Sequence, residues 1–183
     1  MSFLVSALTA SLVAVLPLGT VAGRDVTIEA SFRAAGGPAA PQAVTFDTQA
    51  VPVGSRVTVT ERAGDDTYVE LRLRGVEANR TFGAHVHRKP CGNKPNESGL
   101  HYQDSEDPEQ PSTNPAYADP RNEVWLDIRT DRHGDGGSAA TQAWRFRAGQ
   151  ARSVVIHEHA THTEPGAAGT AGARLACVNV PFA

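Results

Sequence analysis

Short runs in which apolar and polar residues alternate recur along most of the chain. This two-residue period is typical of a strand that has one face in a core and the other in solvent. Glycine and proline breaks, such as GGP at 36–38 and PVGS at 52–55, separate the runs. The pattern predicts strands at 26–32, 43–49, 56–62, 68–75, 84–87, 123–130, 142–147, 152–159 and 173–180, with a turn at 131–138.

No segment has the period of an amphipathic helix, and no internal repeat is visible. A long polar segment, from about residue 88 to 121, is rich in proline, asparagine and acidic residues. Long loops in a compact domain often carry function. The chain is therefore predicted to be all-β, as a Greek-key flattened β-barrel or sandwich with long loops.

The length and charge of the chain limit the classes of protein to which it can belong. Its 183 residues suit one compact domain. The formal net charge is −3 and no basic run stands out, so no nucleic-acid partner is expected.

The first 22 residues form an apolar run that ends in small residues, as an export signal does. Pro17 and Gly19 interrupt this run too early for a comfortable membrane span. We therefore expect an export signal at 1–22, a domain at 25–183, and a secreted or extracytoplasmic protein with no stable membrane span after signal removal. An uncleaved anchor is the alternative.

The chain has two cysteines, Cys91 and Cys177. An even count in an exported protein favours one disulfide, which would close a long loop. Two buried free thiols are the alternative.

Histidines are few and unevenly placed. In GAHVHRKPCG, at 83–92, His85 and His87 stand two residues apart, so in a strand they project from the same face. His101 lies in the long loop and His157 on a late predicted strand. Neutral imidazoles are good ligands for copper and zinc, although buried histidines often only satisfy hydrogen bonds.

The segment HEHATH, at 157–162, is close to a zinc-protease motif but does not match it. That motif requires a histidine at the fifth position of a helical segment. Here the fifth position is Thr161, and the preceding SVVI favours a strand.

Four segments, in order, carry a resemblance to a known family. GAHVH, SGLHYQ, RSVVIHE and AGARLACVNV resemble the G-F-H-V-H, G-x-H-F-N, R-S-V-V-V-H-E and G-S-R-L-A-C-G-V segments of the copper/zinc superoxide dismutases. The resemblance covers about residues 75–183, and before residue 75 only the strand character agrees.

The resemblance implies a role for individual residues. His85, His87 and His157 match copper ligands, and His101 matches the imidazole that lies between copper and zinc in two-metal members. That imidazole releases copper on reduction and carries a proton in the family. Cys91 and Cys177 match the family's disulfide, and Arg174 matches the arginine that holds the superoxide anion beside copper.

The family's zinc site is where the resemblance fails. It uses two further histidines and an aspartate, but residues 102–127 contain no histidine. Zinc is therefore not expected as a cofactor, and the chain resembles a copper-only member in which one carboxylate of the loop holds His101 in place of zinc. The candidates are Asp104, Glu106, Asp107, Glu109, Asp119 and Glu123.

The resemblance implies a secreted enzyme that uses copper to disproportionate superoxide into oxygen and hydrogen peroxide. A non-catalytic protein that stores or delivers copper is the main alternative, and a structural domain that has lost its metal is a third. Arg174 separates the first two, since storage requires no anion site. The oligomeric state is left open.

Overall fold

A computed structural model describes residues 25–38 and 41–183. The predicted export signal at 1–22 lies outside the described residues and stays a prediction. In the described part, the regular structure is a set of strands and one short 3-10 helix, η1 (Pro95–Ser98). No helix in this part is both long and apolar enough to cross a membrane.

Most strands belong to two sheets. Sheet A runs in the order β1-β4-β5-β9, and its neighbouring strands are antiparallel. Its strands are β1 (Val26–Ser31), β4 (Arg56–Ala63), β5 (Thr67–Arg74) and β9 (Gly136–Gln142). Sheet B runs in the order β2-β3-β11-β10-β7, with β2 (Arg33–Ala34), β3 (Ala43–Thr45), β11 (Arg174–Asn179), β10 (Ser153–His157) and β7 (Ala84–His87). A short pair joins β6 (Thr81–Phe82) to β8 (Ile128–Arg129).

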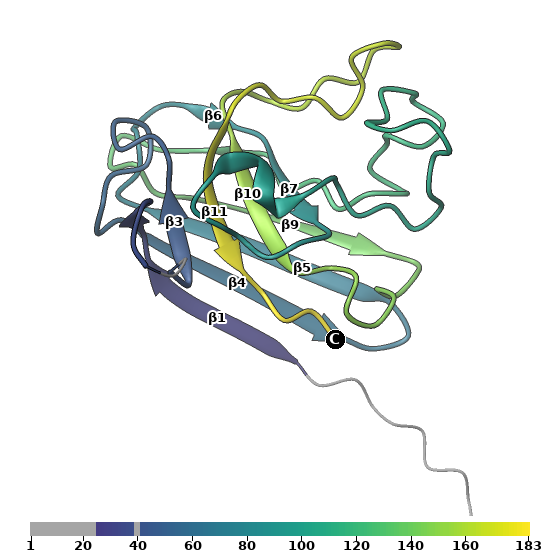
Figure 1. The fold of residues 1–183 in the computed structure, drawn as a ribbon, viewed down its shortest axis with the longest axis horizontal. Coiled ribbons are helices and arrows are strands. Elements are labelled where there is room, and N and C mark those ends of the chain that lie inside the picture. The colour runs from purple at the N-terminus through teal and green to yellow at the C-terminus, as the bar shows by residue number, and fades with distance from the viewer. Residues whose placement is uncertain (1–24, 39–40) are drawn as a thin grey trace, which may run out of the picture.

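The two sheets face each other across one apolar core (Figure 1). The chain passes from sheet A to sheet B between β1 and β2 and back to sheet A between β3 and β4. It then passes to sheet B between β5 and β7, to sheet A between β7 and β9, and to sheet B again between β9 and β10. These crossings give a Greek-key sandwich, so the predicted fold class is confirmed.

Strands β7 and β10 are buried on both faces, unlike the strands of sheet A. Ala84 and Val86 pack into the core between the sheets. Because side chains alternate along a strand, His85 and His87 point to the opposite side of sheet B. Both histidines are fully buried there, since loops cover that side.

The predicted strand at 142–147 is wrong, and part of the predicted turn at 131–138 is strand instead. Strand β9 has the sequence GGSAATQ, which lacks apolar alternation, but its seven residues pair with β5. A Cβ on Gly136 would lie 2.7 Å from the Ile128 side chain, so this close approach requires glycine. Trp144 and Phe146, whose alternation suggested a strand, pack instead against Tyr102.

Two other predicted strands are reduced to two or three residues. Within 123–130 only β8 is a regular strand, although Trp125 bridges to His85. Strand β3 ends at Thr45, because the Asp47 carboxylate accepts hydrogen bonds from the backbone of Gln49 and Ala50 and forms a turn.

Two long loops project from the same side of the sandwich, one at about 100–127 and one at 158–173 (Figure 1). They touch each other, since the Gly166 amide donates to the Thr113 carbonyl at 3.2 Å. Together they cover part of the outer face of sheet B.

Cys91 and Cys177 form the disulfide that the sequence favoured, with Cα atoms 5.7 Å apart. Both sulfurs lie in a small apolar cluster with Val44 and Val155, on the outer side of sheet B. The bond ties the segment that follows β7 to the middle of β11.

The disulfide should contribute strongly to stability. We expect the double substitution C91S/C177S to lower the free energy of unfolding by about 2–5 kcal/mol, because the unfolded chain loses a constraint across 86 residues. Denaturant unfolding of the metal-free protein measures this loss. Reduced wild type should unfold at the same midpoint as the variant, and an unchanged midpoint in the variant would contradict the expectation.

Candidate metal centre

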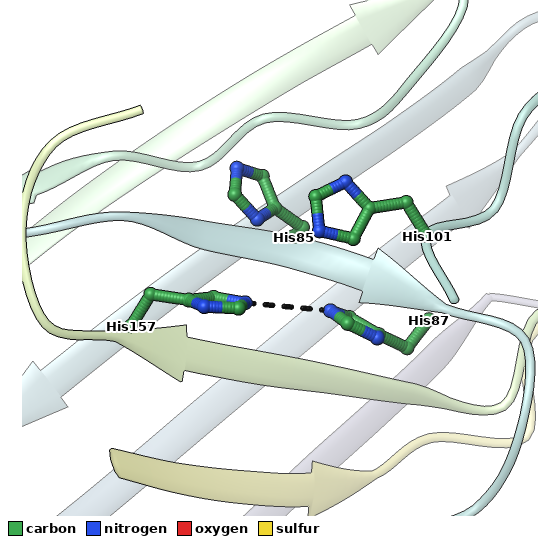
Figure 2. A group of neighbouring side chains, drawn as sticks. All are labelled: His85, His87, His101 and His157. Atoms are coloured by element: carbon green, nitrogen blue, oxygen red, sulfur yellow. Dashed lines mark hydrogen bonds between the residues drawn. The ribbon is translucent and has the colours of Figure 1, made fainter. Parts of the chain in front are cut away.

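Four imidazoles meet on the outer side of sheet B (Figure 2). His85 and His87 come from β7, His157 from the end of β10 and His101 from the loop that follows η1. One ring nitrogen from each residue can be chosen so that all four lie within 4.8 Å of one another. The four histidines singled out in the sequence are thus brought together, although they span 73 positions of the chain.

A hydroxyl–carboxylate pair fixes the protonation of His85. Thr161 donates its hydroxyl proton to the Asp127 carboxylate, and the same oxygen lies 2.8 Å from His85 Nε2. Since that hydroxyl proton is already used, the Thr161 oxygen accepts from His85 Nε2–H. The lone pair of His85 is therefore on Nδ1, which is buried and has no hydrogen-bond partner among residues 25–38 and 41–183. A buried nitrogen without a partner is unusual and fits a metal ligand.

Backbone carbonyls hold two other rings in the opposite tautomer. His87 Nδ1 lies 3.1 Å from the Gly99 carbonyl, and His157 Nδ1 lies 3.4 Å from the Gly172 carbonyl. A carbonyl only accepts, so each Nδ1 carries the proton and each Nε2 has a free lone pair. These two Nε2 atoms lie 3.4 Å apart (Figure 2).

Glu123 holds the fourth ring. Its carboxylate accepts from His101 Nδ1 at 2.8 Å, from the Trp125 indole at 2.8 Å and from the Gln103 amide at 2.8 Å. Three donors compensate a carboxylate that is only 2% exposed. His101 Nε2 is then left with its lone pair. Glu123 is the loop carboxylate that contacts His101, among the six candidates that the sequence offered.

The cluster favours neutral imidazoles. Burial, followed by the neighbouring histidines, holds the pKa values of His85 and His87 well below their usual range. Burial is also the main reason why the pKa of His157 falls to about 3. Neutral imidazole is the form that binds metal ions, so these rings need not lose a proton to do so at neutral pH.

A pocket of about 200 Å³ leads from solvent to the cluster. His101 and His157 line it, whereas His85 and His87 do not, so the cluster is reached from one side. Arg174 also lines this pocket and lies opposite His157 in the β10–β11 register.

Arg174 is held in place by η1. Its guanidinium donates to the Ser98 hydroxyl at 3.0 Å and to the Pro95 carbonyl at 3.2 Å. Burial lowers the pKa of the guanidinium, but arginine stays charged in proteins. The pocket therefore has a positioned cation on its wall, which favours a small anion.

Hydrogen bonds order the loop that carries Glu123. Gln103 accepts from the Asp107 amide at 3.0 Å and from the Gln110 side chain at 2.9 Å, while its own amide donates to Glu123. The Asp107 carboxylate accepts in turn from Ser112. Gln103 thus connects the fold of the loop to the orientation of His101.

The family profile described as Copper/zinc superoxide dismutase (SODC) matches residues 53–180. The chain belongs to the copper/zinc superoxide dismutase family. A search among curated proteins finds no significant match.

Solved structures share the fold of this family member at low sequence identity. A double mutant of a SOD-like protein from Bacillus subtilis is 17% identical, with a TM-score of 0.53 over 71% of this chain and 92% of that chain. The clock protein EA4 is 19% identical, with a TM-score of 0.54 over 70% and 88% of the two chains. A second variant of a SOD-like protein from Bacillus subtilis is 16% identical, with a TM-score of 0.52 over 78% and 96%. At these identities the likeness concerns the fold alone.

The partners that orient the rings were not predicted from the sequence. Trp125, Asp127 and Thr161 were not singled out for this role. The sequence held a signal for Trp125 and Asp127, because core positions alternate with outward-facing positions in the segment EVWLDI at 123–128. Val124, Leu126 and Ile128 lie in the core, so Glu123, Trp125 and Asp127 face the histidines.

Glu123→Gln tests how His101 is held. The amide keeps the shape but replaces one acceptor by a donor, so at least one of the three donors loses its partner. We expect metal affinity to fall by about 10–100-fold and the free energy of unfolding to fall by about 1–3 kcal/mol. Metal competition assays and denaturant unfolding measure the two effects. Glu109→Gln, at an exposed carboxylate of the same loop, should change neither; equal effects in both variants would contradict this role of Glu123.

Proposed function

We propose that this chain is an exported copper enzyme that disproportionates superoxide into oxygen and hydrogen peroxide. The observation that carries the proposal is the convergence of four lone-pair imidazole nitrogens beneath a pocket with a fixed guanidinium on its wall. The Cys91–Cys177 disulfide supports export, because such bonds persist in oxidising compartments.

The donor set fits a copper ion. Imidazole suits copper in both of its common oxidation states, and the proposed ligand atoms are His85 Nδ1 and the Nε2 atoms of His87, His101 and His157. The unpartnered Nδ1 of His85 is the sharpest indication, since a metal ion would satisfy it. His101 borders the pocket, so one side of the site can be reached by a small substrate.

When bound, copper supplies the redox chemistry, taking an electron from one superoxide and giving an electron to another. The chain's own residues do the rest. Arg174 attracts the anion and offers N–H donors in the pocket. His101 borders the same pocket, so its Nε2 would take a proton from solvent and pass it to the substrate, while Glu123 at Nδ1 keeps the ring oriented.

The proposed site does not require zinc. Residues 102–127 offer no histidine, and the buried Glu123 already occupies His101 Nδ1. A hydrogen-bonded carboxylate thus takes the orienting role that a second metal would otherwise have.

A copper storage or delivery protein would use the same four histidines. It would not need the arginine that η1 holds beside the pocket, and this favours the enzyme. The two functions separate experimentally through copper content and turnover measured on the same sample.

His157→Ala tests the copper site. We expect wild type to retain one copper per chain after dialysis against a weak chelator, and the variant to lose most of it, because one of four converging nitrogens is gone. Elemental analysis gives the content. His133→Ala, at an exposed histidine of the 131–135 turn, should retain the metal. Full copper in His157→Ala would exclude the site.

Arg174→Ala separates the enzyme from the storage protein. We expect turnover of superoxide to fall by about 10–100-fold, since the anion loses local attraction, while copper content stays unchanged. The remaining turnover should also depend less on ionic strength. Arg152→Ala, at an exposed arginine just before β10, is the matched control. If wild type that is fully loaded with copper showed no turnover, the enzyme proposal would be wrong and copper storage would be favoured.

A further inference from the structure

A second group of imidazoles lies on the surface, just beyond β10. His159 and His162 belong to the segment HEHATH, which fails as a zinc-protease motif. Their ring centroids are 5.0 Å apart and the rings meet edge to face. His159 is exposed and His162 is half-buried, so neither ring has a place in the core.

Both rings present the same nitrogen for coordination. His159 Nδ1 lies 3.0 Å from the Ala160 carbonyl, and His162 Nδ1 lies 2.8 Å from the Glu164 carboxylate. Each Nδ1 therefore donates, and each neutral ring keeps its lone pair on Nε2. A carboxylate or carbonyl at the second nitrogen is the usual support of a metal-binding histidine.

Gly172 allows two potential ligand atoms to approach the same stretch of backbone. A Cβ at this position would lie 2.7 Å from His159 Nε2 and 2.8 Å from Glu158 Oε2. Glu158 Oε2 accepts one hydrogen bond, from the Ala173 amide at 3.1 Å, and a carboxylate oxygen can accept more than one. An imidazole nitrogen and a carboxylate oxygen thus lie near each other at the surface, both against the Gly172 backbone.

The backbone beneath these side chains is firmly held. The amides of Glu158 and His159 donate to the carbonyls of Ala173 and Ala171, at 3.0 and 3.1 Å. On its other side, the His159 carbonyl accepts from the Gly83 amide at 2.7 Å. The ligand atoms therefore start from an ordered scaffold, which lowers the entropy cost of binding an ion.

We propose that Glu158, His159 and His162 form a second metal site for a divalent ion of borderline softness, such as Zn²⁺ or Cu²⁺. His159 Nε2 and Glu158 Oε2 are the ligands beside Gly172, and the half-exposed His162 supplies its Nε2 by rotation of its side chain. Imidazole with carboxylate is a donor set that such ions take in open, partly hydrated sites.

The site is separate from the buried histidine cluster. Gly172 lies between them, because its carbonyl faces His157 Nδ1 at 3.4 Å while its Cα faces His159 and Glu158. The two sites share no ligand. The proposal goes beyond the superoxide chemistry and does not rest on it.

Equilibrium dialysis against Zn²⁺, starting from metal-free full-length protein, tests the proposal by counting ions. We expect His159→Asn and Glu158→Gln each to bind one zinc fewer per chain than wild type, whatever the buried cluster takes. Glu158→Gln keeps an oxygen that can accept from the Ala173 amide, so it removes charge with little change of shape. His133→Asn removes an exposed histidine from the turn at 131–135 and should bind as wild type does.

Melting temperatures of the metal-free variants confirm that each has folded. A loss of one zinc in the two site variants but not in His133→Asn supports the site. Equal zinc counts in wild type, His159→Asn and Glu158→Gln would overturn it. An equal loss in His133→Asn would also overturn it, because binding would then reflect exposed histidines in general.

Discussion

The two-residue period of β7 is the constraint on which the rest of the centre depends. Ala84 and Val86 point into the core between the sheets, so His85 and His87 must point the other way. A shift of β7 by one residue would place the imidazoles in the core, so both the apolar packing and the histidine cluster would be lost. The pairing of Val154 and Ile156 on β10 with the core residues of β7 sets the register that brings His157 to the same side. Three of the four histidines are therefore positioned by hydrophobic packing of the sheet, whereas His101 is positioned by its loop.

These four rings form a candidate metal centre because each has a partner on its second nitrogen. Thr161, the Gly99 and Gly172 carbonyls and Glu123 decide which nitrogen carries the proton. Each free lone pair then belongs to a defined atom, and burial keeps the rings of His85, His87 and His157 neutral. The surface pair, His159 and His162, follows the same rule with a carbonyl and a carboxylate, but in a setting open to water. Burial thus distinguishes the candidate centre from the proposed surface site, although both rely on imidazole nitrogens.

Access and charge come from the segments that cover sheet B. The disulfide fixes the segment that follows β7 against β11. The helix η1 belongs to this segment and holds the Arg174 guanidinium. Gln103 joins the long loop to Glu123 and hence to His101. These polar contacts order a loop that has no histidine besides His101. Removing any one of these contacts would change the positions of Arg174 or His101, but it would leave the four histidine ligands in place.

The sequence by itself determined the all-β class, most strand positions and the four histidines, because alternation and ordered motifs are local signals. It also pointed to Cys91 and Cys177 and to Arg174. It was misleading at 142–147, where Trp144 and Phe146 alternate but pack against Tyr102, and at β9, whose small residues take their strand from pairing with β5. Only the tertiary structure selected Glu123 among six carboxylates, assigned the tautomers and placed His159 beside Glu158 at Gly172. The physical reason is that a hydrogen bond between residues tens of positions apart depends on how sheets and loops pack, and no local pattern of residues encodes that distance.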